Sequence, residues 1–469
     1  HSLLVLAIAI TTLNAQMSAN QIDSLVHKAM NTVNNTVGFS IGIVKNGKIL
    51  HAKGYGLTSV ETNTNVNENT PFGIASNSKA FTSVALALLV DQGKIKWDDK
   101  VVDYIPEFKM YNDYVTNNFN IKDLLTHRSG LGLGVGDLMI FPNDSEFTIH
   151  DVLNSFQYFK PTSAFRTKFD YDNLLYLVAG ELTVRVSGQS WESFVEETIL
   201  KPLGMKNSYA SLSNIIDASS IAIPHGFIEN ELIALGVEKS NTNMNVAAGV
   251  IWSSAADMCQ WLLAQLNKGK YGNDLSRVLF SEQQHQEMWS MHTPIPKQLD
   301  PNSPFKSHFY GYGLGWFVSD FNGYLKIEHS GLIAGMASEV ILLPELELGI
   351  VLLNNTEKSR MLNGLISYAL LDEFLNLNTG IDWIEMASVM QQQRGNWVDE
   401  DTENVWKDVK LNENTTYNKK NYIGIYEDHW FGKVEVYDNN DELWFKSYKS
   451  PRLNGKMHYY KDHTFVIKW

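Results

Sequence analysis

A serine and a lysine that lie three residues apart, Ser76 and Lys79, form the first candidate for chemistry in this sequence. Apolar residues follow them at three- and four-residue spacing up to Gly93, a pattern typical of a buried helix that ends in a glycine cap. We therefore expect both side chains on one face at the helix N-terminus, where unpaired backbone N–H groups favour negative charge. A hydroxyl beside an amine base is suited there to attack on a carbonyl group.

Lys79 can act as a base only if it is neutral. A free lysine has a pKa of about 10.4, so holding it neutral near pH 7 costs on the order of 4 kcal/mol. Only a buried, preformed site can sustain that cost. The alternative is that Ser76 caps the helix beside a solvated lysine, and the spacing and helix context alone leave both interpretations open.

Two other serines stand in motifs that compete with Ser76. Ser303 and Lys306 repeat the same spacing, but Pro304 between them predicts a surface loop with no apolar helix behind it. Ser40 stands in a GxSxG motif that would mark a nucleophile between a strand and a helix in an α/β-hydrolase. The Asn46-Gly47 turn that follows instead predicts a β-hairpin, which leaves Ser40 on a strand.

Lys79 needs a proton partner, and Tyr171 and Asn173 provide a phenol and an amide just before a helical pattern. The same YxN spelling also occurs at residues 271–273 and 437–439, so the spelling alone does not decide. Only the first copy lies at an element boundary, between the SxxK segment and a later strand-like segment that carries His329.

Composition narrows the class of protein. The 469 residues are 44% hydrophobic and 19% charged, which predicts a globular chain with two or more domains. A net charge of −14 and a pI near 5.4, without basic runs, oppose nucleic-acid binding. Cys259 is the single cysteine, so we expect no internal disulfide and place it in the core. The histidines lack metal-ligand spacing, and no metal or other cofactor is expected.

The N-terminus predicts export. An apolar run over residues 3–13 has the length of a signal peptide and is too short to span a bilayer, with a cleavage point after Ala15. We assign residues 1–16 to a signal peptide, which is incomplete because the basic start is missing. The expected location is periplasmic or secreted, without stable membrane insertion.

The rest of the chain predicts an α+β fold. Residues 39–50 and 338–354 each form a strand-turn-strand pattern, and amphipathic helical patterns lie between them. We therefore expect one antiparallel sheet built from both ends of the chain, flanked by helices and with a helical insertion. The helical patterns lie around residues 82–89, 174–186, 191–199 and 255–266.

The pattern of apolar and charged residues changes after about residue 375, which predicts a second structural unit. We divide the chain into a main domain over residues 17–375, a helical linker over 376–415 and a small β domain over 416–469. The last unit alternates apolar and polar positions, is rich in aromatic residues, and has expected turns at Asn439-Asn440 and Asn454-Gly455.

Three motifs in this order, SNSK at 76–79, YDN at 171–173 and HSG at 329–331, resemble the penicillin-recognising serine hydrolases. The closest resemblance is to the class C β-lactamase-related group, which includes esterases, D-aminopeptidases and D,D-peptidases. The resemblance implies a β-lactamase/transpeptidase-like fold and extends over roughly residues 22–369. The C-terminal unit is similar to a lipocalin-like module that is cut short. Further matching segments are residues 124–131, 201–205, 247–258 and 311–316.

The resemblance also implies roles for individual residues. Ser76 would be the nucleophile and Lys79 its base, and Tyr171 would carry a proton to the leaving group. Asn173 would hold the substrate amide. The backbone N–H groups of Ser76 and Leu332 would form the oxyanion hole, which acyl transfer requires.

The third motif departs from the group, because His329-Ser330-Gly331 replaces the Lys-Thr-Gly of β-lactamases. An unperturbed histidine is only about one-quarter charged at pH 7, whereas a lysine would pair with a substrate carboxylate. We therefore predict a preference for esters or peptides without a carboxylate at that point. The expected substrate is a small molecule or peptide, with peptidoglycan fragments among the candidates. The alternative is a penicillin-binding or peptidoglycan-sensing protein that is acylated without efficient turnover.

Overall fold

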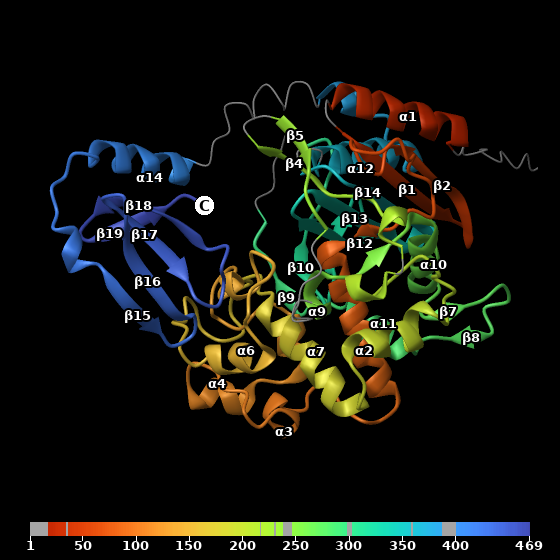
Figure 1. Ribbon diagram of the computed structural model, residues 1–469. Coiled ribbons are helices and arrows are strands. Elements are labelled where there is room, and N and C mark those ends of the chain that lie inside the picture. Colours follow the sequence, from red (N-terminus) through yellow and green to blue (C-terminus); the bar gives the residue numbers. More distant parts are fainter. Residues whose placement is uncertain are drawn as a thin grey trace, which may run out of the picture.

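The computed structural model describes eight stretches of the chain, from Met17 to the C-terminus, and Figure 1 shows their arrangement. They are residues 17–33, 36–215, 217–228, 231–237, 246–297, 303–357, 360–386 and 400–469. The expected signal peptide and residues 387–399 of the expected linker lie outside them.

The centre of the fold is an antiparallel sheet of eight strands in the order β2-β1-β14-β13-β12-β11-β10-β9. Strand β1, from near the N-terminus, pairs with β14 in a register that sets Ile41 opposite Leu352. The sheet is therefore built from both ends of the chain, as the two hairpin patterns predicted. The strands are β1 Gly38–Lys45, β2 Lys48–Gly56, β9 Thr293–Pro294, β10 Tyr310–Tyr312, β11 Phe317–Phe321, β12 Tyr324–Ile333, β13 Met336–Leu343 and β14 Leu348–Asn354.

The first hairpin turns where the sequence predicted. Asn46 and Gly47 both have positive φ, 50° and 72°, which gives the reversed turn that matches the twist of two paired strands. Ser40 lies inside β1, is buried, and donates a hydrogen bond to the carbonyl oxygen of Lys53. The GxSxG motif is therefore part of a strand and not a strand-to-helix elbow.

Helices cover both faces of the sheet. On one face α1 (Ala19–Thr32) and α12 (Arg360–Phe374) pack on the strands, with Ile22, Ile341 and Ile366 in the shared core. On the other face α10 (Ala255–Leu266) lies against β1 and β14 and leads into the helical region. The other helices there are α2 Ser78–Asp91, α3 Val101–Tyr104, α4 Asp113–Asn118, α5 Ile121–Leu125, α6 Ile149–Ser155, α7 Leu174–Ser187, α8 Trp191–Val195, α9 Val246–Gly249 and α11 Glu282–Trp289.

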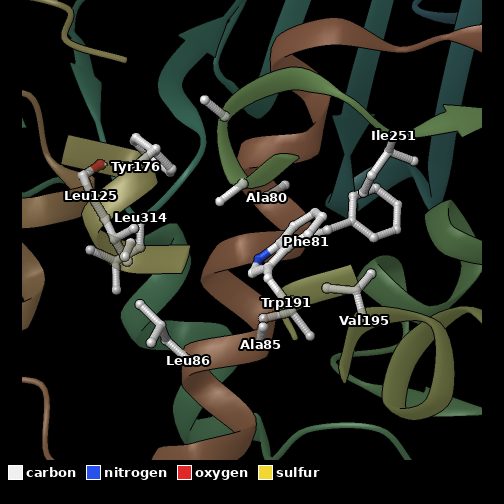
Figure 2. Close-up of a cluster of buried hydrophobic side chains, with 14 of the residues drawn as sticks. Ala80, Phe81, Ala85, Leu86, Leu125, Tyr176, Trp191, Val195, Ile251 and Leu314 are labelled. Carbon is white, nitrogen blue, oxygen red and sulfur yellow. Dashed lines mark hydrogen bonds between the residues drawn. The ribbon is translucent and has the colours of Figure 1, made fainter. Parts of the chain in front are cut away.

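Helix α2 runs through the middle of this helical region. Ser78 to Leu89 are all buried, and Phe81 stacks on Trp261 with ring centroids 3.8 Å apart. Figure 2 shows Trp191, Val195 and other apolar side chains packed around it. Burial on every side holds the helix in place, because its apolar surface would otherwise face water. The helix ends before Gly93, whose positive φ supplies the expected cap.

Short two-stranded sheets complete the main part of the fold. Strand β3 pairs with β6 directly before the SxxK segment, β4 pairs with β5, and β7 pairs with β8. They are β3 Phe72–Gly73, β4 His225–Ile228, β5 Glu231–Ala234, β6 Trp252–Ser253, β7 Lys270–Tyr271 and β8 Arg277–Val278.

A five-stranded antiparallel sheet follows α14 (Glu400–Leu411), and together they form the C-terminal module (residues 400–469). The expected turn at Asn454-Gly455 is wrong, because both residues begin β18. A side chain at Gly455 would approach Ile467 to 2.7 Å, so the glycine there permits close packing of β19. The strands are β15 Gly424–Asp428, β16 Gly432–Asn439, β17 Glu442–Ser447, β18 Asn454–Lys461 and β19 Thr464–Ile467. No helix in the described stretches is long and apolar enough to cross a membrane.

Candidate active site

Ser76 stands in a tight turn directly before α2. Residues Ala75–Asn77 form a 3₁₀ turn, so Ser76 precedes the α-helix and does not lie in its first turn as predicted. Ala75 has φ 48°, a left-handed conformation that costs a non-glycine residue about 1 kcal/mol or more. Ser338 holds the turn, since its hydroxyl accepts from Asn77 Nδ2 and donates to the Ile74 carbonyl oxygen. The nucleophile candidate is thus fixed by the neighbouring strand β13.

Lys79 lies beside Ser76, on the shared face that the spacing predicted, and it is completely buried, which the spacing alone left open. Its Nζ lies 3.2 Å from Ser76 Oγ, 2.8 Å from Asn173 Oδ1 and 2.8 Å from the carbonyl oxygen of Ala248. The amide and carbonyl oxygens can only accept hydrogen bonds, whereas the serine hydroxyl can also donate one. A neutral amine has two N–H bonds and one lone pair. It can therefore donate to Asn173 and Ala248 while its lone pair faces the Ser76 hydroxyl.

Burial favours this neutral form. It lowers the pKa of Lys79 to about 7, although the charges of Asp137 and Asp172 act in the opposite direction. The lysine is thus close to half neutral at pH 7. Helix α9 and the chain after it are held near the amine by two contacts from α2, in which Thr82 donates to the Ala247 carbonyl and Ser78 accepts from the Ile251 N–H.

Both the oxygen and the nitrogen of the Asn173 side-chain amide form hydrogen bonds within the protein. Its oxygen accepts from Lys79, and its Nδ2 donates to both carboxylate oxygens of Asp137 at 3.2 Å. The predicted role was to hold a substrate amide, and Asn173 does line the pocket. The contacts add a second role, because they fix the acceptor that keeps the lysine in place. Burial raises the pKa of Asp137.

Tyr171 lies over the same lysine. Lys79 Nζ is 4.8 Å from its ring centroid, and His127 stacks on the ring at 4.1 Å. Burial raises the pKa of the Tyr171 phenol, which the nearby Ser76 hydroxyl partly offsets. Its Oη is buried and makes no hydrogen bond of normal geometry to any described residue. The phenol is therefore protonated at pH 7 and its proton is available near the serine.

His329 is held neutral. Its Nδ1 lies 2.7 Å from the carbonyl oxygen of Ser330, to which it donates, so its Nε2 accepts from the Tyr312 hydroxyl at 3.0 Å. Burial, with the charge of Lys79, lowers the pKa of His329 to about 3. The sequence predicted a partly charged histidine. The structure removes that charge, because the ring is only 2% exposed and lies near a cationic group.

Gly331 explains how β12 reaches the serine turn. A side chain at this position would come within 2.3 Å of the Ile74 carbonyl oxygen and 2.9 Å of Ala75 Cβ. The glycine therefore lets the strand lie directly against the turn. Leu332, the next residue, pairs with Ala337 and has a side chain 45% exposed. Its backbone is carried close to the turn, where the predicted oxyanion hole would form.

A pocket of about 540 Å³ opens over these residues. It is lined by six of the eight residues predicted as the site: Ser76, Tyr171, Asn173, His329, Ser330 and Leu332. Lys79 lies beneath Ser76, and Gly331 supports the strand. The remaining wall is largely apolar and includes Ile140, Phe141, Val237, Trp252, Phe317 and Ile333. Across the described stretches, no group of three His, Cys, Asp or Glu side chains could hold a metal ion.

Solved structures share this fold. A class C beta-lactamase mutant superposes with a TM-score of 0.60 at 22% identity, covering 76% of this chain and 99% of that one. The octameric penicillin-binding protein homologue from Pyrococcus abyssi gives a TM-score of 0.67 at 22% identity, over 94% of this chain and 91% of that one.

The sequence itself matches the beta-lactamase family over residues 22–372. This chain belongs to the beta-lactamase family. Among curated members, it is 29% identical over 372 residues to the unguisins hydrolase ungD' of Aspergillus campestris, covering 76% of this chain and 66% of that protein. It is 28% identical over 346 residues to the protein flp of Staphylococcus aureus, covering 72% of this chain and 63% of that protein. The chain thus spans a little under two thirds of the length of these relatives.

Sequence reasoning missed several polar groups of this beta-lactamase-family site. Asp172 is buried at the start of α7, and burial with the charge of Asp137 raises its pKa to about 8. His127 and Ala248 stand in segments that carried the family resemblance, at 124–131 and 247–258, so that signal could have found them. Asp137 lies outside those segments and outside the three motifs, so no sequence signal pointed to it. It contacts Asn173 from the loop before the cis Phe141-Pro142 peptide bond.

Proposed function

We propose that this protein is a serine acyl hydrolase that works through a covalent acyl-enzyme at Ser76. One observation carries the proposal: the buried Lys79 amine has two acceptors for its N–H bonds and the Ser76 hydroxyl on its third side. This arrangement gives the serine a base that is available near pH 7.

The reaction follows from these positions. Ser76 Oγ attacks the substrate carbonyl carbon as its proton passes to Lys79 Nζ, and the carbonyl electrons move to the oxygen. The backbone N–H groups of Ser76 and Leu332 stabilise this oxyanion. When the oxyanion collapses, the bond to the leaving group breaks and the leaving group takes a proton from the Tyr171–Lys79 pair. Water then attacks the acyl-enzyme by the reverse proton path and releases the acid.

Two features of the pocket support a proposal for the substrate class. Its wall is largely apolar, and His329, at the place of the β-lactamase lysine, is neutral. Esters, D-amino-acid peptides or amides without a carboxylate at that position therefore fit better than penicillins. The name of the relative ungD' as a hydrolase supports turnover over simple acylation. We also propose that the protein is exported, on the basis of the apolar run over residues 3–13.

Labelling tests the nucleophile and the acyl donor together. A fluorophosphonate and a penicillin should each be followed by intact mass and peptide mapping. We expect one fluorophosphonate adduct on Ser76, its loss in Ser76→Ala, and its retention in Ser303→Ala, which alters the second SxxK motif. An adduct on Ser40 or Ser303 would overturn the assignment. Steady ester turnover supports the hydrolase, whereas a single stoichiometric burst supports the penicillin-binding alternative.

A further inference from the structure

The C-terminal module contacts the loop that forms one wall of the pocket. The backbone N–H of Glu146 donates to the Lys449 carbonyl oxygen at 2.6 Å, and Arg452 Nε donates to Asp144 Oδ2 at 2.9 Å. Lys449 also pairs with Asp151 at the start of α6.

Aromatic contacts extend this junction. Phe147 and Phe431 lie with ring centroids 5.6 Å apart, and Phe159 and Trp430 lie 5.2 Å apart. Phe147 and Phe431 belong to the same continuous core as helix α2. The module is therefore packed onto the catalytic part of the chain by apolar and charged contacts, and it does not hang from it by a linker alone.

Arg452 belongs both to this junction and to the lining of the pocket. It lines the pocket together with Pro142 and Asn143 of the loop. Of the described residues that line the pocket, it is the one with a formal charge, and most of the other lining residues are apolar. The Asp144 carboxylate meets its Nε edge, which orients the planar guanidinium. A guanidinium held this way is a geometry that carboxylates recognise.

We propose that Arg452 is a specificity-determining residue, and that the C-terminal module thereby supplies an acid-binding subsite to the active site. The fitting substrate is an ester or amide with an apolar acyl chain that ends in a carboxylate. Its scissile carbonyl lies at Ser76, and its carboxylate binds Arg452 and not the neutral His329. This inference rests on the proposed function for the identity of the scissile bond.

A purely structural role is the competing explanation, because the Arg452–Asp144 pair also ties the module to the loop. The two roles differ in what they change. Loss of a tie would disturb the loop for every substrate alike, whereas loss of a substrate contact would affect acidic substrates selectively. The decisive quantity is therefore the ratio of kcat/KM for two substrates that differ only in the terminal group.

The experiment compares p-nitrophenyl hexanoate with the mono-p-nitrophenyl ester of adipic acid, which has the same chain length and ends in a carboxylate. Full-length wild type, Arg452→Gln and Arg452→Lys are assayed at pH 8. Lys456→Gln is the matched control, since Lys456 is on the same module, pairs with Glu442 and does not line the pocket. We expect Arg452→Gln to lower kcat/KM for the acidic ester by about tenfold and to change the neutral ester by less than about twofold. Arg452→Lys should fall between them, and Lys456→Gln should match the wild type.

Binding keeps the test independent of turnover. Titration calorimetry of both esters is repeated with Ser76→Ala and with Ser76→Ala/Arg452→Gln, in which neither ester should be consumed. Tighter binding of the acidic ester that disappears with Arg452→Gln supports the subsite, even if the wild type hydrolyses neither ester. The absence of hydrolysis would contradict the proposed function alone. An equal loss for both esters, or an unchanged ratio in rate and binding, overturns the subsite and leaves Arg452 as a structural tie.

Discussion

The rate of Ser76 acylation should be proportional to the fraction of Lys79 that is neutral, because only the neutral amine can take the serine proton. With a pKa of about 7, the lysine is about 1% neutral at pH 5 and about 90% neutral at pH 8. We therefore expect the acylation rate to rise about 90-fold from pH 5 to pH 8 and then to level off. A solvated lysine with a pKa of about 10.4 would be only about 0.04% neutral at pH 7, so burial makes the base about a thousandfold more abundant.

The rate of burst-phase release from a neutral p-nitrophenyl ester measures this step, with intact mass confirming acylation and circular dichroism confirming the fold at each pH. The Asp172 carboxyl, with a pKa of about 8, adds a second step near the plateau. Because the Asp172 carboxyl is mostly protonated below pH 8, Asp172→Asn should leave the acid limb near pH 7 almost unmoved and should remove the second step. Asp274→Asn, at an exposed hairpin, is the control. A rate that is constant from pH 5 to 8, or that still climbs above pH 9, would refute the reasoning.

Three further predictions follow from the same geometry. The pKa of Lys79 is lower in the folded state than in the unfolded state, so the free energy of unfolding should rise with pH between about 7 and 10. Lys79→Met should remove a destabilisation of about 4 kcal/mol at pH 7, offset by about 1–3 kcal/mol for each hydrogen-bond acceptor that is left unpaired. With both the Asn173 and Ala248 oxygens left unpaired, urea unfolding should show this variant within about 2 kcal/mol of the wild type, yet inactive; a larger loss of stability would contradict the buried-amine argument. Gly331→Ala should cost about 1–3 kcal/mol and slow acylation because of its contact with Ile74, whereas Gly364→Ala, in open space on α12, should stabilise by about 0.5–1 kcal/mol; equal thermal shifts would count against it. A short-chain nitrophenyl ester should have a larger kcat/KM than nitrocefin because His329 is neutral, and the reverse order would refute this.

Local sequence signals predicted local structure well. The Asn46-Gly47 turn and the buried helix that follows the SxxK motif depend on neighbouring residues, so pattern alone located them, although the helix begins at Ser78 and not at Ser76. The same reasoning failed at Asn454-Gly455, where the glycine serves contact with a strand that follows later in the chain. A glycine in a sequence does not state whether it serves a turn or a close approach.

The sequence by itself determined which side chains of the site have the functional groups for acyl transfer. They are a serine, a lysine at helical spacing, a phenol and an amide, with a histidine where a lysine is usual. Only the tertiary structure decided their states. The protonation of Lys79 and His329 depends on burial and on charges contributed by distant loops, and the Arg452 wall depends on the packing of a separate module. Desolvation and through-space charge are properties of the folded surroundings, so no local pattern of residues encodes them.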